Sequence, residues 1–171
     1  MRAVFGLSAA ILITSAYVAC GASNDDLLPV TPPPGGFPSP LVVAGGLQIK
    51  YFAKVRGARV MATGPDGAVY VSVASDNEVV RVWDANGDNV ADSARVVVSG
   101  LNDPSGLAFH KGYLYIANTN GVVRAQLDNQ GKLVGSVTPV STLSGGGGHS
   151  TRTIGFGADS AMYVSVGSTC N

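Results

Sequence analysis

From Leu47 onward, apolar and polar residues alternate over short stretches, and turn-forming residues separate one stretch from the next. This period of two is typical of β-strands, whereas a sustained period of 3.6, which would indicate amphipathic helices, is not seen. Three stretches share one plan: an apolar strand, a turn, and a second strand that contains a tyrosine. They are Met61–Val73, Leu107–Asn118 and Ile154–Val166.

The repeat has the length of a propeller blade. Tyr70, Tyr115 and Tyr163 hold the same place in the three stretches and are spaced by 45 and 48 residues. Repeats of about 40–50 residues built only from strands are typical of β-propellers. We therefore predict an all-β fold of the β-propeller class, with these tyrosines packed between neighbouring blades. Further strands are predicted at Glu78–Trp83, Arg95–Ser99, Gly121–Leu127 and Ser136–Val140.

The predicted domain, residues 47–171, is long enough for about two and a half blades, whereas propellers close with about 4–8. We therefore expect the chain to be the N-terminal part of a longer protein, because an open stack would expose an apolar blade face. Cys170 fits this expectation. If Cys20 carries a lipid, the partner of Cys170 in an exported protein is expected downstream, and the alternative is a buried free thiol.

Residues 1–19 have the features of a secretory signal: a short positive start followed by an uncharged stretch too short to span a membrane comfortably. The sequence around Cys20 resembles a bacterial lipobox, which predicts lipidation of Cys20, although Tyr17 replaces the usual leucine. The alternative is ordinary cleavage near Ala19 or Ala22, with Cys20 removed or left free. Both readings predict an exported protein, periplasmic or in the cell envelope.

Residues 20–46 are predicted to be a linker. Six of the nine prolines lie between Ser23 and Pro40. Proline-rich sequence of this kind is extended and cannot form a packed core. It is interpreted as a tether between a lipid anchor and the folded domain, or as a disordered mature N-terminus.

The charge pattern excludes one class of partner. Lys and Arg number 11, Asp and Glu also number 11, and no run of cations occurs. Phosphate backbones require clustered cations, so nucleic acid is not expected to bind. Contact with a membrane is expected only through the lipid anchor. The acidic residues are ten Asp and a single Glu, which disfavours a helical bundle.

The most distinctive segment is Ser144–Gly157, which begins with four consecutive glycines before His149. Glycines let a loop approach a ligand closely, and His149 is the best candidate for a general base. Arg152 is the candidate partner of an anionic cofactor. The alternatives are an exposed surface histidine and an arginine bonded to nearby carbonyls. His110, beside a hairpin turn, is expected to be structural or exposed.

A second candidate site is the set of oxygen-bearing residues between two predicted strands. Their spacing suits a hard cation such as calcium, but the glycine and the final glutamate of an EF-hand loop are out of place. An Asx-rich hairpin is the favoured alternative. The four candidate ligands are Asp84, Asn86, Asp88 and Asp92.

Several segments together resemble the sorbosone and soluble glucose dehydrogenase family of quinoproteins. They are residues 57–72, 84–92, 100–109, 148–157 and 162–171. The resemblance implies a six-bladed propeller that binds pyrroloquinoline quinone (PQQ) and calcium and oxidises a small sugar, polyol or aldehyde. It implies that His149 takes the substrate proton and that Arg152 matches an arginine near the cofactor. Most other cofactor ligands are then expected in later blades.

Two other function classes stay open: a calcium-dependent propeller hydrolase of the gluconolactonase type and a non-catalytic binding propeller. A lactonase channel relies on clustered carboxylates, whereas this chain has one glutamate, Glu78. The glycine-run histidine and its nearby arginine favour the dehydrogenase. The sequence specifies neither the substrate within this class nor the electron acceptor.

Overall fold

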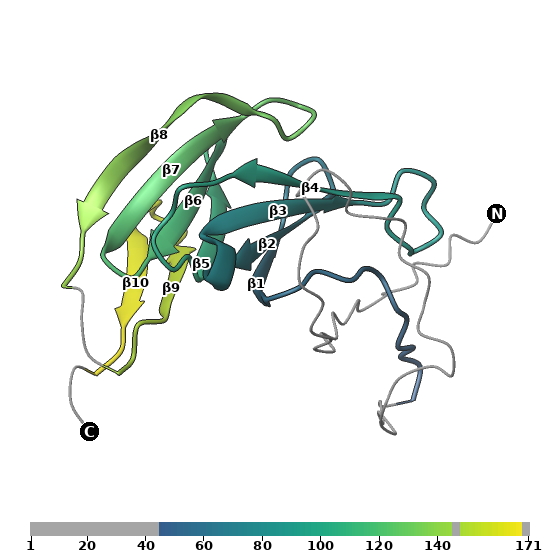
Figure 1. Ribbon diagram of the computed structural model, residues 1–171, viewed down its shortest axis with the longest axis horizontal. Coiled ribbons are helices and arrows are strands. Elements are labelled where there is room, and N and C mark those ends of the chain that lie inside the picture. Colours follow the sequence, from purple (N-terminus) through teal and green to yellow (C-terminus); the bar gives the residue numbers. More distant parts are fainter. Residues whose placement is uncertain (1–44, 145–147, 169–171) are drawn as a thin grey trace.

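The computed structural model describes residues 45–144 and 148–168, which form three antiparallel sheets side by side (Figure 1). The first sheet, blade 1, has the order β1-β2-β3-β4, and the second, blade 2, the order β5-β6-β7-β8. The third, the half blade, pairs β9 with β10. The bounds are β1 Ala58–Thr63, β2 Val69–Val73, β3 Glu78–Trp83, β4 Ser93–Val98, β5 Gly106–His110, β6 Tyr113–Asn118, β7 Gly121–Leu127, β8 Leu133–Thr142, β9 Arg152–Phe156 and β10 Met162–Val166.

The arrangement of the sheets is that of a β-propeller. Strands consecutive in the sequence are neighbours in each sheet, and the inner strands lie against one another, β1 against β5 and β5 against β9. Two four-stranded blades and half of a third confirm the predicted fold class and the predicted two and a half blades. The strands predicted at Glu78–Trp83 and Gly121–Leu127 have the predicted bounds.

Helical structure is confined, in the part of the chain that is described, to a short 3-10 turn, η1 (Ala74–Asp76). No helix there is long and apolar enough to cross a membrane. The predicted signal at residues 1–19, Cys20, Cys170 and most of the predicted linker lie outside the described residues. Those assignments therefore stay predictions.

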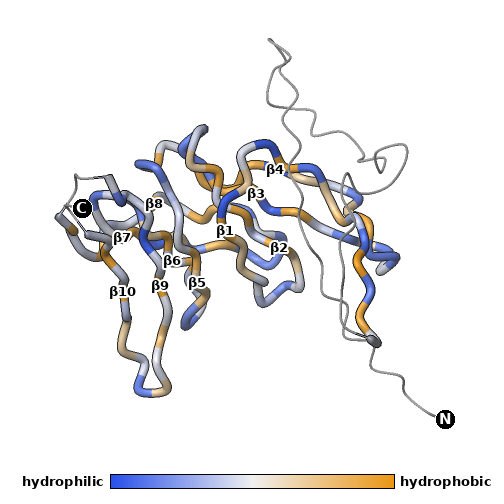
Figure 2. The backbone as a smooth tube through the Cα atoms, turned by 90° about the horizontal axis from the view of Figure 1, so that it is seen from below, coloured by the Kyte–Doolittle hydropathy of each residue, from blue (hydrophilic) through white to orange (hydrophobic). Residues whose placement is uncertain are grey.

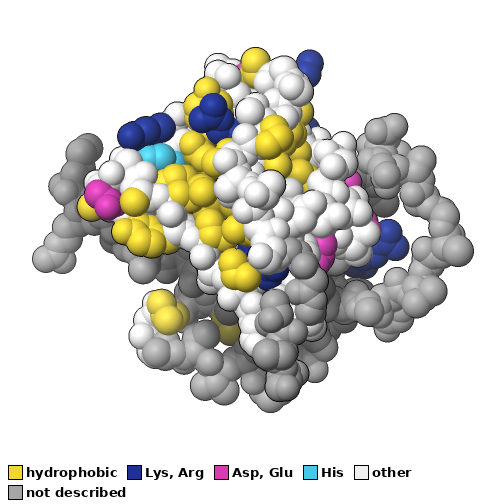
Figure 3. Space-filling model, turned by 90° about the vertical axis from the view of Figure 1, so that its left-hand side faces the viewer, with side chains coloured by type: hydrophobic (Ala, Val, Ile, Leu, Met, Phe, Trp, Pro, Cys, Tyr) yellow, Lys and Arg dark blue, Asp and Glu magenta, His cyan; other side chains and the backbone are white. Residues whose placement is uncertain are grey.

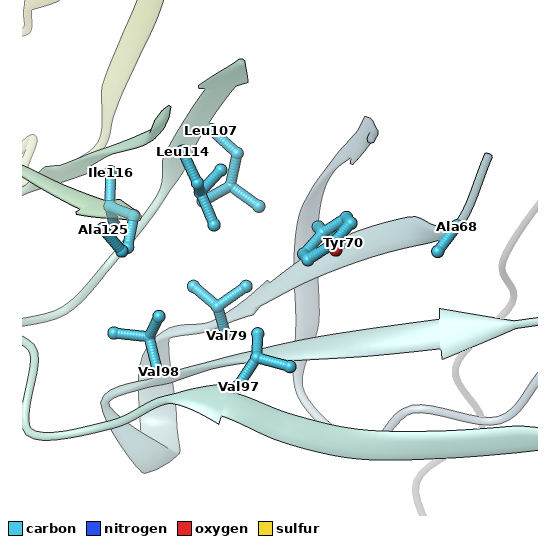
Figure 4. Packing of buried hydrophobic residues seen from close by; sticks show 9 residues of the cluster. All are labelled: Ala68, Tyr70, Val79, Val97, Val98, Leu107, Leu114, Ile116 and Ala125. Atoms are coloured by element: carbon cyan, nitrogen blue, oxygen red, sulfur yellow. The ribbon is translucent and has the colours of Figure 1, made fainter. Parts of the chain in front are cut away.

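The main core lies between blade 1 and blade 2. Figure 4 shows side chains of the two sheets facing each other, with Tyr70 beside the valines of blade 1 and opposite Leu114. Valines, an isoleucine and a tyrosine are prominent in this interface, and β-branched and aromatic side chains of these kinds pack well on a pleated surface. Figure 2 shows the resulting pattern along the chain, with hydrophobic strand segments and hydrophilic turns between many of them.

Two of the three repeated tyrosines, Tyr70 and Tyr115, pack between blades, as predicted. The Tyr70 ring meets Phe109 of blade 2 edge to face, with centroids 4.8 Å apart, and Tyr115 meets Phe156 of the half blade at the same distance. Each such pair adds about 0.5–1.5 kcal/mol beyond the burial of its area. Tyr163, the third of the series, is 62% exposed.

Candidate functional site

The inner strands β1, β5 and β9 all begin at one end of the sheets, which we call the entry end. The alternation of strand and turn dictates this, because each inner strand is followed by a hairpin turn at the opposite end. His149 lies in the loop that precedes β9, so it is at the entry end. Loops of this kind, held by a rigid scaffold, are where propellers place their functional groups.

Hydrogen bonds join the entry-end loops of successive blades. The Asp103 amide donates to Asn77 Oδ1 at 2.8 Å. The Thr119 hydroxyl lies 2.9 Å from Asp103 Oδ2 and 3.2 Å from the carbonyl oxygen of Ser150. The loop that contains His149 is therefore tied to the turns of both complete blades.

The start of β9 is anchored on β5. Ser105 Oγ accepts a hydrogen bond from the Arg152 amide at 2.8 Å and donates to the Arg152 carbonyl at 2.9 Å. Gly106 makes the close approach of the two backbones possible, because a Cβ there would lie 2.8 Å from the Arg152 carbonyl oxygen. The residues directly after the His149 loop are thus held in place by blade 2.

Arg152 holds the shape of the loop. Its side chain is buried, with 1% of the residue exposed. Nη1 donates to the carbonyls of His149 at 2.8 Å and of Thr151 at 3.2 Å, and Nη2 donates to the carbonyl of Ser144 at 3.1 Å. The guanidinium therefore bridges the two ends of the glycine run, which is the structural alternative considered for this residue. Its Nε is buried and has no hydrogen-bond partner among the described residues.

His149 itself is exposed at the entry end. Its main chain is fixed by Arg152, and its Cβ lies beside Gly167, which follows β10. The His149 side chain is thus exposed on a backbone whose carbonyl is held by Arg152.

Arg59 is a candidate that sequence reasoning missed. It is an exposed residue of β1, and its Nη2 donates to the hydroxyl of Thr151 at 3.0 Å, two residues after His149. A side chain of blade 1 therefore reaches the loop of the half blade. The signal available in the sequence was a charged residue at the start of an inner strand, but the contact spans 92 residues and follows only from the ring-like arrangement.

The predicted calcium ligands form a turn whose oxygens bind the backbone. Asp84 accepts hydrogen bonds from the amides of Gly87 and Asn89, and Asp92 accepts one from Ala85. Asn86 and Asp88 each accept one from the amide two residues later. This is the Asx-rich hairpin favoured above. Among the described residues, no group of three or more His, Cys, Asp or Glu could hold a metal ion.

The opposite end of the sheets carries structural polar groups. His110 stacks on Phe156 with centroids 4.1 Å apart, so it is structural, as one of the two expectations had it. A cleft of about 340 Å³ lies between blades 1 and 2, lined in part by Asp66, Tyr70 and Phe109. None of its lining residues belongs to the His149 loop, so we do not assign it to that candidate site.

Asp66, Tyr70 and Arg81 form the polar cluster beside this cleft. Asp66 Oδ2 accepts from Arg81 Nε at 2.8 Å and from the Tyr70 hydroxyl at 3.0 Å. Burial alone would raise the pKa of Asp66, but the hydrogen bonds from Arg81, Tyr70 and the Ala68 amide outweigh it and lower the pKa. Burial, together with the charge of Asp66, raises the pKa of Tyr70 to about 12.

Solved structures with a similar fold include two of Family AA12 of the Carbohydrate-Active Enzymes from Trichoderma reesei, an iodide and a calcium structure, at 21% and 20% identity. A third is the holo form of the pyranose dehydrogenase PQQ domain from Coprinopsis cinerea, at 18%. Each has a TM-score of 0.57 and covers 66% of this chain.

This chain spans only 28–30% of the length of those structures. At these identities the likeness shows the fold, and it agrees with the partial propeller described above. No family model and no curated protein matches the chain.

Proposed function

We propose that this chain is the N-terminal part of a PQQ-dependent oxidoreductase that oxidises a small sugar, polyol or aldehyde. One observation carries the proposal: the loop that bears His149 is fixed by a buried arginine and also receives Arg59 from blade 1. An imidazole and a guanidinium from different blades thus converge on one entry-end loop. The fold likeness to a PQQ domain in its holo form adds support.

The residues present fit part of what the cofactor requires. PQQ is a planar quinone with carboxylate groups, so its site needs cations. Arg59 fits this need because it is exposed, and the contact described for it uses one terminal nitrogen. Arg152 has both terminal nitrogens engaged by carbonyls, so in this proposal it shapes the loop. Direct contact between Arg152 and the cofactor stays a prediction.

Calcium does not fit the described residues, since no cluster of ligands exists among them. In the proposal, a calcium ion bound with the cofactor takes its ligands from later blades.

The reaction proposed is the oxidation of a hydroxyl-bearing carbon to a carbonyl; for an aldehyde, that carbon is the one of its hydrate, which becomes a carboxylic acid. When bound, PQQ supplies the two-electron oxidant that accepts a hydride from that carbon. An imidazole nitrogen of His149 accepts the hydroxyl proton, so that proton and hydride leave together as the carbonyl forms. Arg152 keeps the His149 backbone in one position during this transfer, and Arg59 binds an anionic group beside it.

We also propose that the protein is exported and anchored through a lipid on Cys20, which would place the reaction in the periplasm or at the cell envelope. This rests on the signal predicted over residues 1–19 and on the proline-rich segment after it.

The test is dye-linked oxidation of aldoses, polyols and aldehydes by the full-length protein. Turnover is expected only after PQQ and calcium have been added. His149→Ala should then lower turnover by about 10²–10⁴-fold, whereas the control Lys132→Ala, an exposed change in the turn between β7 and β8, should not alter it. Hydrolysis of lactones without the quinone would overturn the proposal in favour of a lactonase. Unchanged turnover in His149→Ala would remove the proposed base.

A further inference from the structure

A polar hollow adjoins the cleft between blades 1 and 2. Its volume is about 510 Å³, and it shares the lining residues Asp66 and Asn129 with that cleft. Two arginines of blade 1, Arg81 on β3 and Arg95 on β4, also line it. By contrast, Figure 3 shows hydrophobic side chains gathered on the side of the molecule where β8 and β10 lie. The two arginines suit the hollow to a charged ligand more than to an apolar one.

Arg81 is held in place on three sides. Nε donates to Asp66 Oδ2 at 2.8 Å, and the guanidinium lies over the Trp83 ring, 4.6 Å from its centroid. The turn between β7 and β8 closes on the stem of the side chain, because a Cβ on Gly131 would collide with Arg81 Cδ. These contacts leave the residue only 8% exposed. An arginine fixed in this way loses little conformational entropy when it binds a ligand.

The ion pair with Asp66 does not require the ends of the Arg81 guanidinium. It forms through Nε, so the two terminal nitrogens, with four N–H groups, are not needed for it. Arg95 is exposed and donates through Nη2 to the carbonyl of Gln130, a bond that does not require its Nη1 or Nε. Forked N–H groups of this kind match the two oxygens of a carboxylate.

The two arginines are also direct neighbours across the sheet. Arg81 and Arg95 are partners in the ladder of β3 and β4. Residues paired in this way are on the same face of the sheet, with Cβ atoms about 4.5–5.5 Å apart, and like charges at such a pair are destabilising. An anion between the two guanidinium groups would remove this repulsion.

The carboxylates around the hollow do not neutralise all of its cations. Asp66 is paired with Arg81. The pKa of Asp128 is lowered by the hydrogen bond from the Lys132 amide and, further, by the charges of Arg95 and Lys132. Three cations therefore accompany two carboxylates, which leaves one positive charge in excess. A ligand with one negative charge balances it, whereas a phosphate ester carries about −1.5 to −2 at neutral pH.

We propose that this hollow binds a small hydroxylated carboxylate, of the class of the sugar acids. The carboxylate lies between Arg81 and Arg95. The hydroxyl groups of the ligand bind Ser93, Asn129 and Gln130, which line the same hollow and carry hydroxyl and amide groups suited to them. The volume is in the range of sites for small organic molecules. The lining residues all belong to blades 1 and 2, and the inference is independent of the chemistry proposed at the entry end.

The experiment titrates the full chain with D-glucuronate, a ring sugar with one carboxylate, and follows the fluorescence of Trp83, its single tryptophan, which lines the hollow. D-Glucose is the matched neutral probe, and acetate and inorganic phosphate are anions without the sugar ring. Arg95→Gln removes one guanidinium, and Arg81→Lys keeps a cation beside Asp66 but removes the fork. The control is Arg56→Gln, an exposed change on the turn before β1.

D-Glucuronate should bind saturably and at least about tenfold more tightly than the other three probes, because only it combines a carboxylate with the hydroxylated ring. Arg95→Gln and Arg81→Lys should each raise its dissociation constant at least about tenfold, whereas Arg56→Gln should not alter it.

Absence of saturable binding, or an unchanged dissociation constant in Arg95→Gln, would overturn the proposed site. Equally tight binding of D-glucose or of phosphate would overturn recognition of a carboxylate. Equally tight binding of acetate would overturn recognition of the hydroxylated ring.

Discussion

Gly131 is the position at which the contact between blades 1 and 2 can be tested most sharply. It has a φ of +72°, and an added Cβ would lie 2.4 Å from Arg81 Cδ and 2.6 Å from both Arg81 Nε and the Tyr70 hydroxyl oxygen. Gly135 is the matched control because its φ is +71° and nothing lies within 4 Å of the added Cβ. Alanine in this left-handed region costs about 1–2 kcal/mol at either position.

The difference between the two variants isolates the close approach. Gly131→Ala must also push Arg81 away from Asp66, and hydrogen bonds to charged groups contribute about 1.5–3 kcal/mol. We therefore expect Gly131→Ala to lower the free energy of unfolding by about 1–3 kcal/mol more than Gly135→Ala does. Urea denaturation followed by fluorescence suits the measurement, because the single tryptophan, Trp83, lies 4.6 Å from the Arg81 guanidinium.

A double variant identifies the cause of the extra loss. If the Cβ acts by displacing Arg81, the additional cost of Gly131→Ala should largely disappear in an Arg81→Ala background. Equal losses for Gly131→Ala and Gly135→Ala would refute the reasoning, since the contact between the blade 2 turn and the blade 1 cluster would then contribute nothing.

The remaining predictions concern titration, the loop and the anchor. Because the pKa of Asp66 is lowered in the fold, its contribution to stability is present above the ordinary carboxylate pKa and is lost as pH falls through the folded value. Asp66→Asn should therefore make the free energy of unfolding, measured by urea titration, depend less on pH between pH 7 and about pH 3. Because the pKa of Tyr70 is raised to about 12, its contribution to stability should be lost as pH rises from about 10 through 12. Tyr70→Phe should remove this titration from the absorbance of phenolate and from the dependence of the free energy of unfolding on pH. Arg152→Leu should speed hydrogen exchange in the loop that precedes β9 while leaving β6 protected, and equal loss of protection in both would contradict its role in shaping the loop. Cys20→Ala should shift the exported protein from the membrane fraction to the soluble fraction, and retention in the membrane would exclude the lipid anchor.

Sequence patterning predicted the architecture because the information is local and repeated. The strand period and the spacing of Tyr70, Tyr115 and Tyr163 imply blades without any knowledge of which residues touch. The packing partners of the first two tyrosines, Phe109 and Phe156, follow from the same repeat. The blade number was predictable for the same reason.

The candidate site was predictable only in part. His149 was found because four glycines before a histidine are unusual in any loop. The contact of Arg59 with the same loop depends on the curvature that brings β1 toward β9, which no local pattern encodes. Arg152 could be singled out by its position, but its hydrogen bonds to the carbonyls of Ser144 and His149 are tertiary contacts that no local pattern encodes.

Binding of PQQ to the full-length protein tests the central claim most directly. Equilibrium dialysis should give one molar equivalent of bound quinone. Arg59→Gln should weaken binding by at least about tenfold, the effect expected when a charge-assisted hydrogen bond is lost, whereas Arg56→Gln, an exposed change on the turn before β1, should not. Absence of bound quinone, or equal binding by the two variants, would contradict the assignment of a quinone site to this entry end.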